Sequence, residues 1–267
     1  MSNTSLSTRI MDVLSPAAIQ KLSICQMPGD GVTQPTNVLT AATDGLLGFQ
    51  LLLISVVFMR TFNSARRKTS KRRAKLSDFF MSLSMLLSAV MSFSGVKDHT
   101  TASIVAAYPY WVTVVLSGVL SSWAFCLACV SDCVRTSRRV TIHAVLPTLI
   151  VASGLFFTVN CNWTFVSFGI SQLPLFMLGV LYSLAAYMHS RLANTVNILM
   201  IVGTIGSIGV QAGGAAIDLH LEAMPHFDYN VVFHFVQMAV FALFFAARMS
   251  GPVRREHSRP LMAKKAK

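Results

Sequence analysis

Seven mostly apolar runs, each close to 20 residues long, constrain this chain more than any other feature of its sequence. The hydrocarbon core of a bilayer is about 30 Å thick, so one helical crossing needs about 20 apolar residues. The runs are Val38–Met59, Phe79–Val96, Tyr108–Val130, Val140–Val159, Phe165–Met188, Val196–Ile217 and Tyr229–Ala247. They predict an all-α, multi-pass membrane protein built as a seven-transmembrane-helix bundle.

Composition supports a membrane class, because hydrophobic residues make up 54% of the chain and charged residues only 12%. An ordinary soluble domain has about 25% charged residues. The connectors between the runs are short and leave no room for a separate soluble domain. We therefore divide the chain into an exposed non-cytosolic arm (residues 1–36), a seven-helix membrane domain (37–248) and a basic cytosolic tail (249–267).

The basic residues fix an orientation. If the connector after the first run is cytosolic, that side holds 19 of the 22 lysines and arginines. Short loops rich in lysine and arginine stay in the cytosol, so the amino terminus is predicted to be luminal and the carboxyl terminus cytosolic. The basic stretch Arg66–Lys75 is then interpreted as a topology signal near anionic lipid, with the bilayer as partner and no nucleic acid.

Three short patterns agree with this orientation. The glycosylation acceptors Asn3-Thr4-Ser5 and Asn162-Trp163-Thr164 both fall on the luminal side. The ending Lys264-Lys265-Ala266-Lys267 is similar to the dilysine retrieval signal of endoplasmic-reticulum proteins, which indicates that membrane or another endomembrane. Cys25 and Cys161 share the oxidising side, where they either pair or remain free thiols.

Several polar side chains fall inside the runs or at their luminal ends, where desolvation makes them costly. They are Asp44 in the first run, His99 directly after the second, and Asn230, His234 and Gln237 on one face of the seventh. Because successive spans run in opposite directions, all five residues should lie at a similar depth in the membrane. A ring of seven helices would bring the first and last spans together. We expect a polar luminal-side pocket between the first, second and seventh spans. A structural polar cluster, a metal or catalytic centre, and a ligand or ion path all remain open, and Gln211 would suit any of them.

Two further patterns have simpler interpretations. Gly203, Gly206, Gly209 and Gly213 predict a helix face in close contact with another helix. Asp132 is interpreted as a boundary ion pair with Arg135.

The polar positions resemble those of the superfamily of alkaline ceramidases, progestin and adiponectin receptors and post-GPI-attachment lipid-remodelling proteins. That superfamily has Ser-x-x-x-His in its second span and His-x-x-x-His in its seventh, where this chain has Gly95-x-x-x-His99 and Asn230-x-x-x-His234. The resemblance implies a zinc ion that activates water to cut a lipid amide or ester. Only the histidine that ends each frame is present, and the family's aspartate in the third span is missing. The same positions also suit a separate seven-span family with an aspartate in its first helix.

Transferred to this chain, the resemblance implies Asp44, His99 and His234 as zinc ligands, with Asn230 and Gln237 as catalytic residues that place the substrate. The first functional hypothesis is accordingly a zinc-dependent lipid amide or ester hydrolase of ceramidase-like type. The second is a non-enzymatic receptor or scaffold that binds a lipid or sterol. The third is a proton-coupled transporter that uses Asp44 and the histidines.

Overall fold

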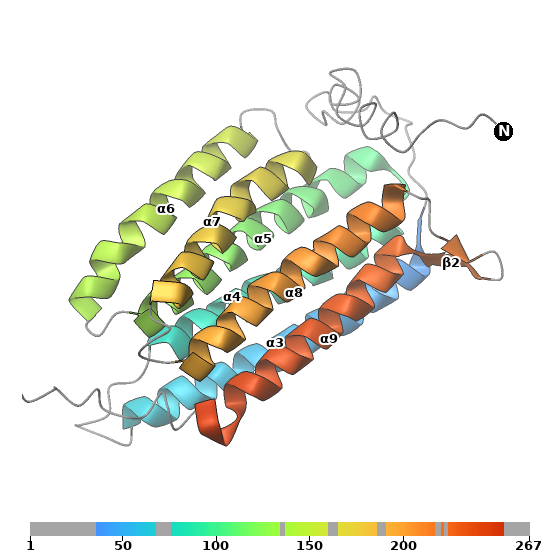
Figure 1. Cartoon of the computed structure of the whole chain (residues 1–267). Helices are drawn as coiled ribbons and strands as arrows, with labels where there is room; N and C mark the ends of the chain where they lie inside the picture. Colours follow the sequence, from blue (N-terminus) through green and yellow to red (C-terminus); the bar gives the residue numbers. More distant parts are fainter. Residues whose placement is uncertain are drawn as a thin grey trace, which may run out of the picture.

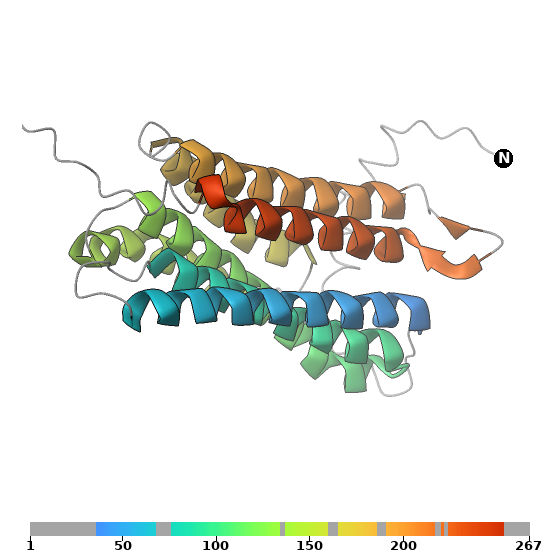
Figure 2. The ribbon, with the colours of Figure 1, turned by 90° about the horizontal axis from the view of Figure 1, so that it is seen from below.

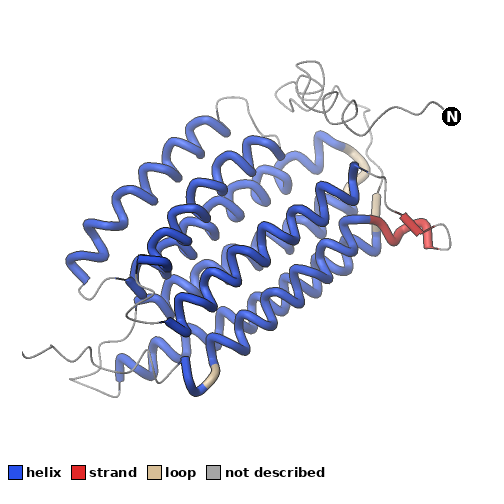
Figure 3. Tube along the Cα trace, in the orientation of Figure 1, coloured by secondary structure: helices blue, strands red, loops and turns tan. Residues whose placement is uncertain are grey.

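The computed structural model describes residues 36–67, 76–133, 137–159, 165–185, 191–216, 220–221 and 224–253. Within these ranges the chain forms seven α-helices and one two-stranded antiparallel hairpin (Figures 1 and 3). The elements are α3 (Val38–Arg67), α4 (Leu76–Thr100), α5 (Ile104–Cys133), α6 (Ser137–Val159), α7 (Phe165–Ala185), α8 (Arg191–Ala216), β1 (His220–Leu221), β2 (Met224–Asp228) and α9 (Tyr229–Met249).

Several predictions fall outside the described residues. They are the arm up to residue 35, most of the basic tail, Arg135, the glycosylation acceptors Asn3 and Asn162, the cysteines Cys25 and Cys161, and the dilysine ending at Lys264 and Lys265.

Six helices form a closed ring, and the seventh packs outside it. Around the ring, each helix contacts the next in the order α3, α4, α5, α7, α8 and α9, and α9 packs against α3. Helix α6 contacts α5 and α7 and lies at the edge of the bundle (Figure 1). In the view of Figure 2, α8 and α9 lie in one layer and α3 in another. The first and last helices do meet, as predicted, but the expected ring of seven helices is wrong because α6 is not part of it.

The outer surface of the bundle is apolar, and many polar side chains are turned inward. Phe156 is 74% exposed and Leu243 is 72% exposed. Contiguous exposed apolar surface of this kind is typical of contact with lipid. Five helices are long and apolar enough to cross a membrane, while α6 and α7 contribute the shorter apolar segments Val140–Phe156 and Gln172–Ala185. These helices indicate a multi-pass membrane protein, and the count of seven spans stays a prediction.

Most helices extend beyond the apolar runs that predicted them. Helix α3 continues eight residues past Met59, and α4 continues from Val96 to Thr100. Polar residues at the ends of membrane helices reach into the headgroup region, where their hydration costs little. His99 therefore lies in the last turn of α4 and does not follow the helix.

Serine hydroxyls connect α3, α4 and α5 inside the bundle. Ser55 and Ser82 lie with their hydroxyl oxygens 3.0 Å apart across α3 and α4. Ser121 of α5 contacts Ser88 at 2.6 Å and Ser84 at 3.1 Å. Small hydroxylated side chains let helices approach closely and hydrogen-bond inside a membrane. The core on this side of the ring is therefore a tight, partly polar packing.

The glycine stripe of α8 makes one of the close contacts that we expected. A Cβ atom added at Gly203 would lie 2.8 Å from Val240 of α9, so glycine is needed there for α8 and α9 to pack. A Cβ atom at Gly206, Gly209 or Gly213 would meet no atom within 4 Å among the described residues. The predicted close-contact face is therefore wrong for these three glycines.

A buried charged cluster joins α5, α8 and α9 at the end of the bundle that carries Arg248. The Arg248 Nη2 atom donates to Asp132 Oδ2 at 2.7 Å, and Nη1 donates to Asn197 Oδ1 at 3.2 Å. Asn197 Nδ2 also donates to Asp132 Oδ2, at 3.0 Å. The Arg248 and Asp132 side chains are only 1% and 2% exposed. Asp132 therefore has a cation partner on α9, and its predicted pair with Arg135 lies outside the described residues.

Removing one partner of this pair leaves the other charge buried and unpaired. We expect Arg248→Met to destabilise the protein by about 3–5 kcal/mol. Combining it with Asp132→Asn should recover part of that loss, because no buried carboxylate then lacks its cation. Thermal unfolding of the purified protein in detergent measures both effects. Arg191→Met, at an exposed arginine of α8, is the control and should change little.

Candidate functional site

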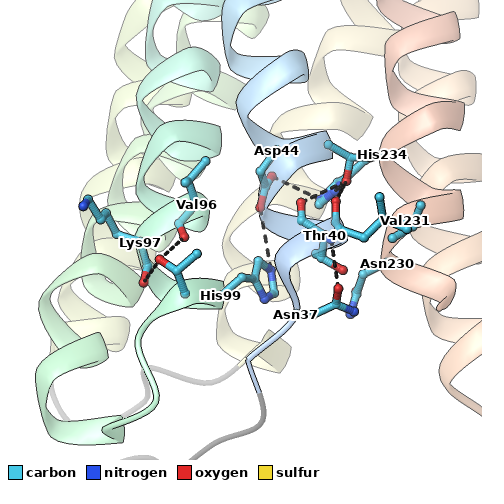
Figure 4. Close-up of polar contacts among 12 residues, drawn as sticks. Asn37, Thr40, Asp44, Val96, Lys97, His99, Asn230, Val231 and His234 are labelled. Atoms are coloured by element: carbon cyan, nitrogen blue, oxygen red, sulfur yellow. Dashed lines mark hydrogen bonds and ion pairs between the residues drawn. The ribbon is translucent and has the colours of Figure 1, made fainter. Parts of the chain in front are cut away.

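Asp44 lies between two histidines from different helices. Its Oδ1 atom is 3.2 Å from His234 Nε2 on α9, and its Oδ2 atom is 3.7 Å from His99 Nε2 on α4 (Figure 4). Asp44 and His234 are each 5% exposed, so this carboxylate and imidazole lie well inside the bundle. Helix α3 packs against both α4 and α9, which brings together residues that are 55 and 190 positions apart in the sequence.

Gly95 makes room for the Asp44 carboxylate. A Cβ atom at Gly95 would lie 2.5 Å from Asp44 Oδ2 and 3.0 Å from its Cγ. A side chain at this position would therefore occupy the space that the carboxylate now fills. The glycine of the frame Gly95-x-x-x-His99 thus leaves space for an aspartate on the neighbouring helix. The ceramidase-like pattern has serine at this position.

The other ring nitrogen of His234 contacts Thr43. The distance from Thr43 Oγ1 to His234 Nδ1 is 2.9 Å, and the same hydroxyl lies 2.9 Å from the carbonyl oxygen of Thr40. A helical threonine usually gives its only proton to such a backbone carbonyl. In that arrangement His234 Nδ1 is the donor to Thr43, because the hydroxyl has no second proton. Nε2 and the facing Asp44 oxygen then share one further proton between them.

Asp228 fastens the start of α9 to the start of α3. Its Oδ1 atom accepts from the backbone N–H groups of Asn230 and Val231 at 3.0 and 3.1 Å, and therefore caps α9. Its Oδ2 atom accepts from Asn37 Nδ2 at 2.8 Å. The N–H group of Asn37 in turn donates to the carbonyl oxygen of His99 at 3.1 Å. These bonds hold α3, α4 and α9 at one level around Asp44.

A cavity of about 210 Å³ opens beside the Asp44 carboxylate. This volume is far above the 10–15 Å³ or so that one water molecule needs. All six helices of the ring line this central cavity. The lining at the His99 end includes Asp44, Asp98, His99, Gln211, Asn230, His234 and Gln237, one wall carries Ser84, Ser88, Ser92, Ser121 and Ser122, and the deeper part includes Phe125, Phe176, Met200, Ile201 and Phe241.

The structure brings together every residue that the sequence singled out for the pocket. Asp44, His99 and His234 form one cluster, while Asn230 and Gln237 line the same central cavity. Gln211 of α8 joins them, because its Nε2 atom donates to Asn230 Oδ1 at 2.9 Å. The catalytic and metal-binding roles assigned to these residues stay predictions.

Three contributors were not identified from the sequence. Thr43 and Asn37 belong to no recognised motif in the sequence, and neither do the serines of α4 and α5. The position of Thr43 directly before Asp44 was the one available signal, because a neighbouring hydroxyl could contact the same partner helix.

The residues as placed do not fit a zinc site. Among the described residues, no group of three or more histidine, cysteine, aspartate or glutamate side chains is arranged to hold a metal ion. Each imidazole faces a different oxygen of Asp44, and His234 Nδ1 already contacts Thr43. The ligand set Asp44, His99 and His234 stays a prediction.

Fold and site together define a multi-pass helical membrane protein with a cavity inside its helix ring that is lined by polar side chains at its His99 end. The chain belongs to a family of unknown function, DUF6962, whose model matches residues 39–251. That match includes α3 to α9 almost completely, and with them the whole Asp44 cluster. No curated protein and no solved structure matches this chain.

The fit between Gly95 and Asp44 can be tested by a double-mutant cycle. We expect Gly95→Ala to destabilise the protein by about 1–3 kcal/mol, because the new methyl group overlaps the carboxylate. In an Asp44→Ala background the same change should cost much less, since alanine favours the helix and the overlap is gone. Thermal unfolding gives all four values. Gly206→Ala, where space is open, should be neutral or slightly stabilising; equal costs of Gly95→Ala in both backgrounds would refute the fit.

Proposed function

We propose that this protein binds an amphipathic small molecule inside its helix ring, as a receptor or carrier in the membrane. The observation that carries this proposal is the graded lining of the central cavity. Ionisable and amide side chains gather at the His99 end, and aromatic and aliphatic side chains line the deeper part. Ligand sites commonly combine a mostly apolar lining with a few placed polar groups.

The gradient suits a molecule with a polar head and an apolar tail. A head beside Asp44, Asn230 and Gln237 would find hydrogen-bond partners in place of water. A tail against Phe125, Phe176 and Phe241 would leave the bilayer for an equally apolar environment. Free energy for binding then comes mainly from the head and from close packing, because lipid already solvates the tail.

The alternative functions have less support from the geometry. A zinc-dependent lipid hydrolase needs a ligand group that the described residues do not form. Transport coupled to protons has one favourable observation, namely the 3.2 Å contact between Asp44 and His234, which share a proton when Thr43 donates to its own helix. A carrier that exchanges ligand for this proton is the second candidate.

For the membrane arrangement we propose seven spans, with the His99 end luminal and the Arg248 end cytosolic. The distribution of lysine and arginine supports this orientation, and the dilysine ending supports the endoplasmic reticulum or another endomembrane.

The orientation predicts opposite locations for the two ends of the chain. An epitope tag before Met1 should be protected from protease in sealed microsomes, whereas a tag after Lys267 should be digested. Detergent should expose both tags. Digestion of both tags in sealed vesicles would require an even number of spans and would overturn the arrangement.

Filling the cavity should displace the ligand. Thr204 lines the central cavity. Its hydroxyl donates to the carbonyl oxygen of Met200 in the same helix, at 2.9 Å. Thr204→Phe therefore adds bulk to the cavity without breaking an interhelical hydrogen bond that we observe. The phenyl ring would take space that a ligand needs, so retention should fall roughly tenfold or more, a loss of about 1.4 kcal/mol. Mass spectrometry of lipids that co-purify with the protein measures retention. Val202→Phe is the matched control, since Val202 faces outward with 57% of its surface exposed.

A further inference from the structure

The charge of Asp44 has no fixed counter-charge in the central cavity. Among the described residues that line it, the charged side chains are Asp44 and Asp98, and none is lysine or arginine. Lys97 is exposed and points away from Asp44 (Figure 4). Arg248 forms an ion pair with Asp132 at the opposite end of the bundle. The partners of Asp44 are two imidazoles, which carry a positive charge only when protonated.

A carboxylate in a membrane interior is paired with a cation or is protonated, because an isolated charge costs several kcal/mol. Here the compensating charge is exchangeable: either a proton or a cation that enters the cavity. The site therefore favours a ligand that brings a positive charge with it.

A second observation points to a ligand at the same place. Ser92 of α4 lines the central cavity and is 2% exposed, yet its hydroxyl oxygen has no hydrogen-bond partner among the described residues. Ser92 lies one helical turn before Gly95, the residue against which the Asp44 carboxylate packs. A buried hydroxyl without a partner costs about 1–3 kcal/mol, and a ligand head that bonds it would remove this cost.

Aromatic residues extend the same preference. Trp111, the eighth residue of α5, and Phe233, the fifth residue of α9, both line the central cavity, and both helices begin at the His99 end. Ring faces attract ammonium groups, more strongly when water is excluded. A bare metal ion would gain nothing from the apolar lining around Phe125, Phe176 and Phe241, whereas an alkyl chain would fill it.

We propose that the ligand is an amphiphilic amine, whose ammonium group pairs with Asp44 and donates to Ser92 while its alkyl chain lies in the deeper cavity. This inference rests on the proposed ligand-binding function and adds the chemical class of the ligand. Asp44 then has the role of the counter-ion, and the ammonium group takes the place of the proton that Asp44 and His234 otherwise share.

The test compares three probes with the same chain: dodecylamine, dodecanol and dodecanoate. Their binding to the full-length protein is measured by scintillation proximity in nanodiscs of zwitterionic phosphatidylcholine, with Thr204→Phe as the background for partitioning into lipid. Wild-type protein should bind the amine at least about tenfold more tightly than the alcohol, the difference expected for a charge-assisted hydrogen bond. The carboxylate should bind most weakly.

Asp44→Asn keeps the shape and removes the charge, so it should lower amine affinity about tenfold and leave alcohol affinity within about twofold. Ser92→Ala should weaken the amine more than it weakens the alcohol, and thermal unfolding verifies that each variant is folded. Should Asp44→Asn fail to fold, the ranking of the three probes on wild-type protein still decides.

The outcomes separate the two proposals. Equal binding of amine and alcohol that Thr204→Phe abolishes would overturn the amine and leave the ligand-binding function standing. Preference for the carboxylate would do the same. Binding of all three probes that Thr204→Phe leaves unchanged would instead overturn the function, because no probe would then occupy the central cavity.

Discussion

The cost of placing polar groups in hydrocarbon governs the arrangement of this protein. Lipid offers no hydrogen-bond partners, so a polar side chain inside the membrane is costly unless it pairs within the bundle or with a molecule in the cavity. The serine contacts of α3, α4 and α5, the Asp228 cap of α9 and the Asp132–Arg248 pair all meet this requirement. The outer surface, by contrast, carries the large apolar side chains. The polar groups that can pair with one another thus help to determine which helices become neighbours.

The same constraint explains what could be read from the sequence. Apolar runs locate helices because a crossing needs a minimum length, and each of the seven runs corresponds to a helix of the structure. Alternating direction gives each polar residue a depth, and depth alone placed Asp44, His99 and His234 at one level. Their meeting also required α3 to pack on both α4 and α9, which was an assumption about neighbours.

Position within the plane of the membrane could not be read in this way. The length of an apolar segment indicates how deep each of its residues lies in the membrane. Which helices become neighbours depends on the fit between side chains of different segments, which the sequence of one segment does not show. An ion pair of Asp132 with the nearby Arg135 was therefore predicted, whereas its contact with Arg248, 116 residues further along the chain, was not. For the same reason α6 was expected in the ring, and the open surroundings of Gly206 were not foreseen.

The two buried aspartates show why one cluster is interpreted as structural and the other as functional. Asp132 has a permanent cation in Arg248, and Asn197 bonds to both side chains. Asp44 faces only imidazoles and adjoins a cavity. A carboxylate with a fixed cation has its charge balanced without a ligand, whereas a carboxylate with an exchangeable partner changes its free energy whenever that partner changes. Binding can therefore be coupled to helix packing at the Asp44 cluster, where Gly95 allows the carboxylate no spare room.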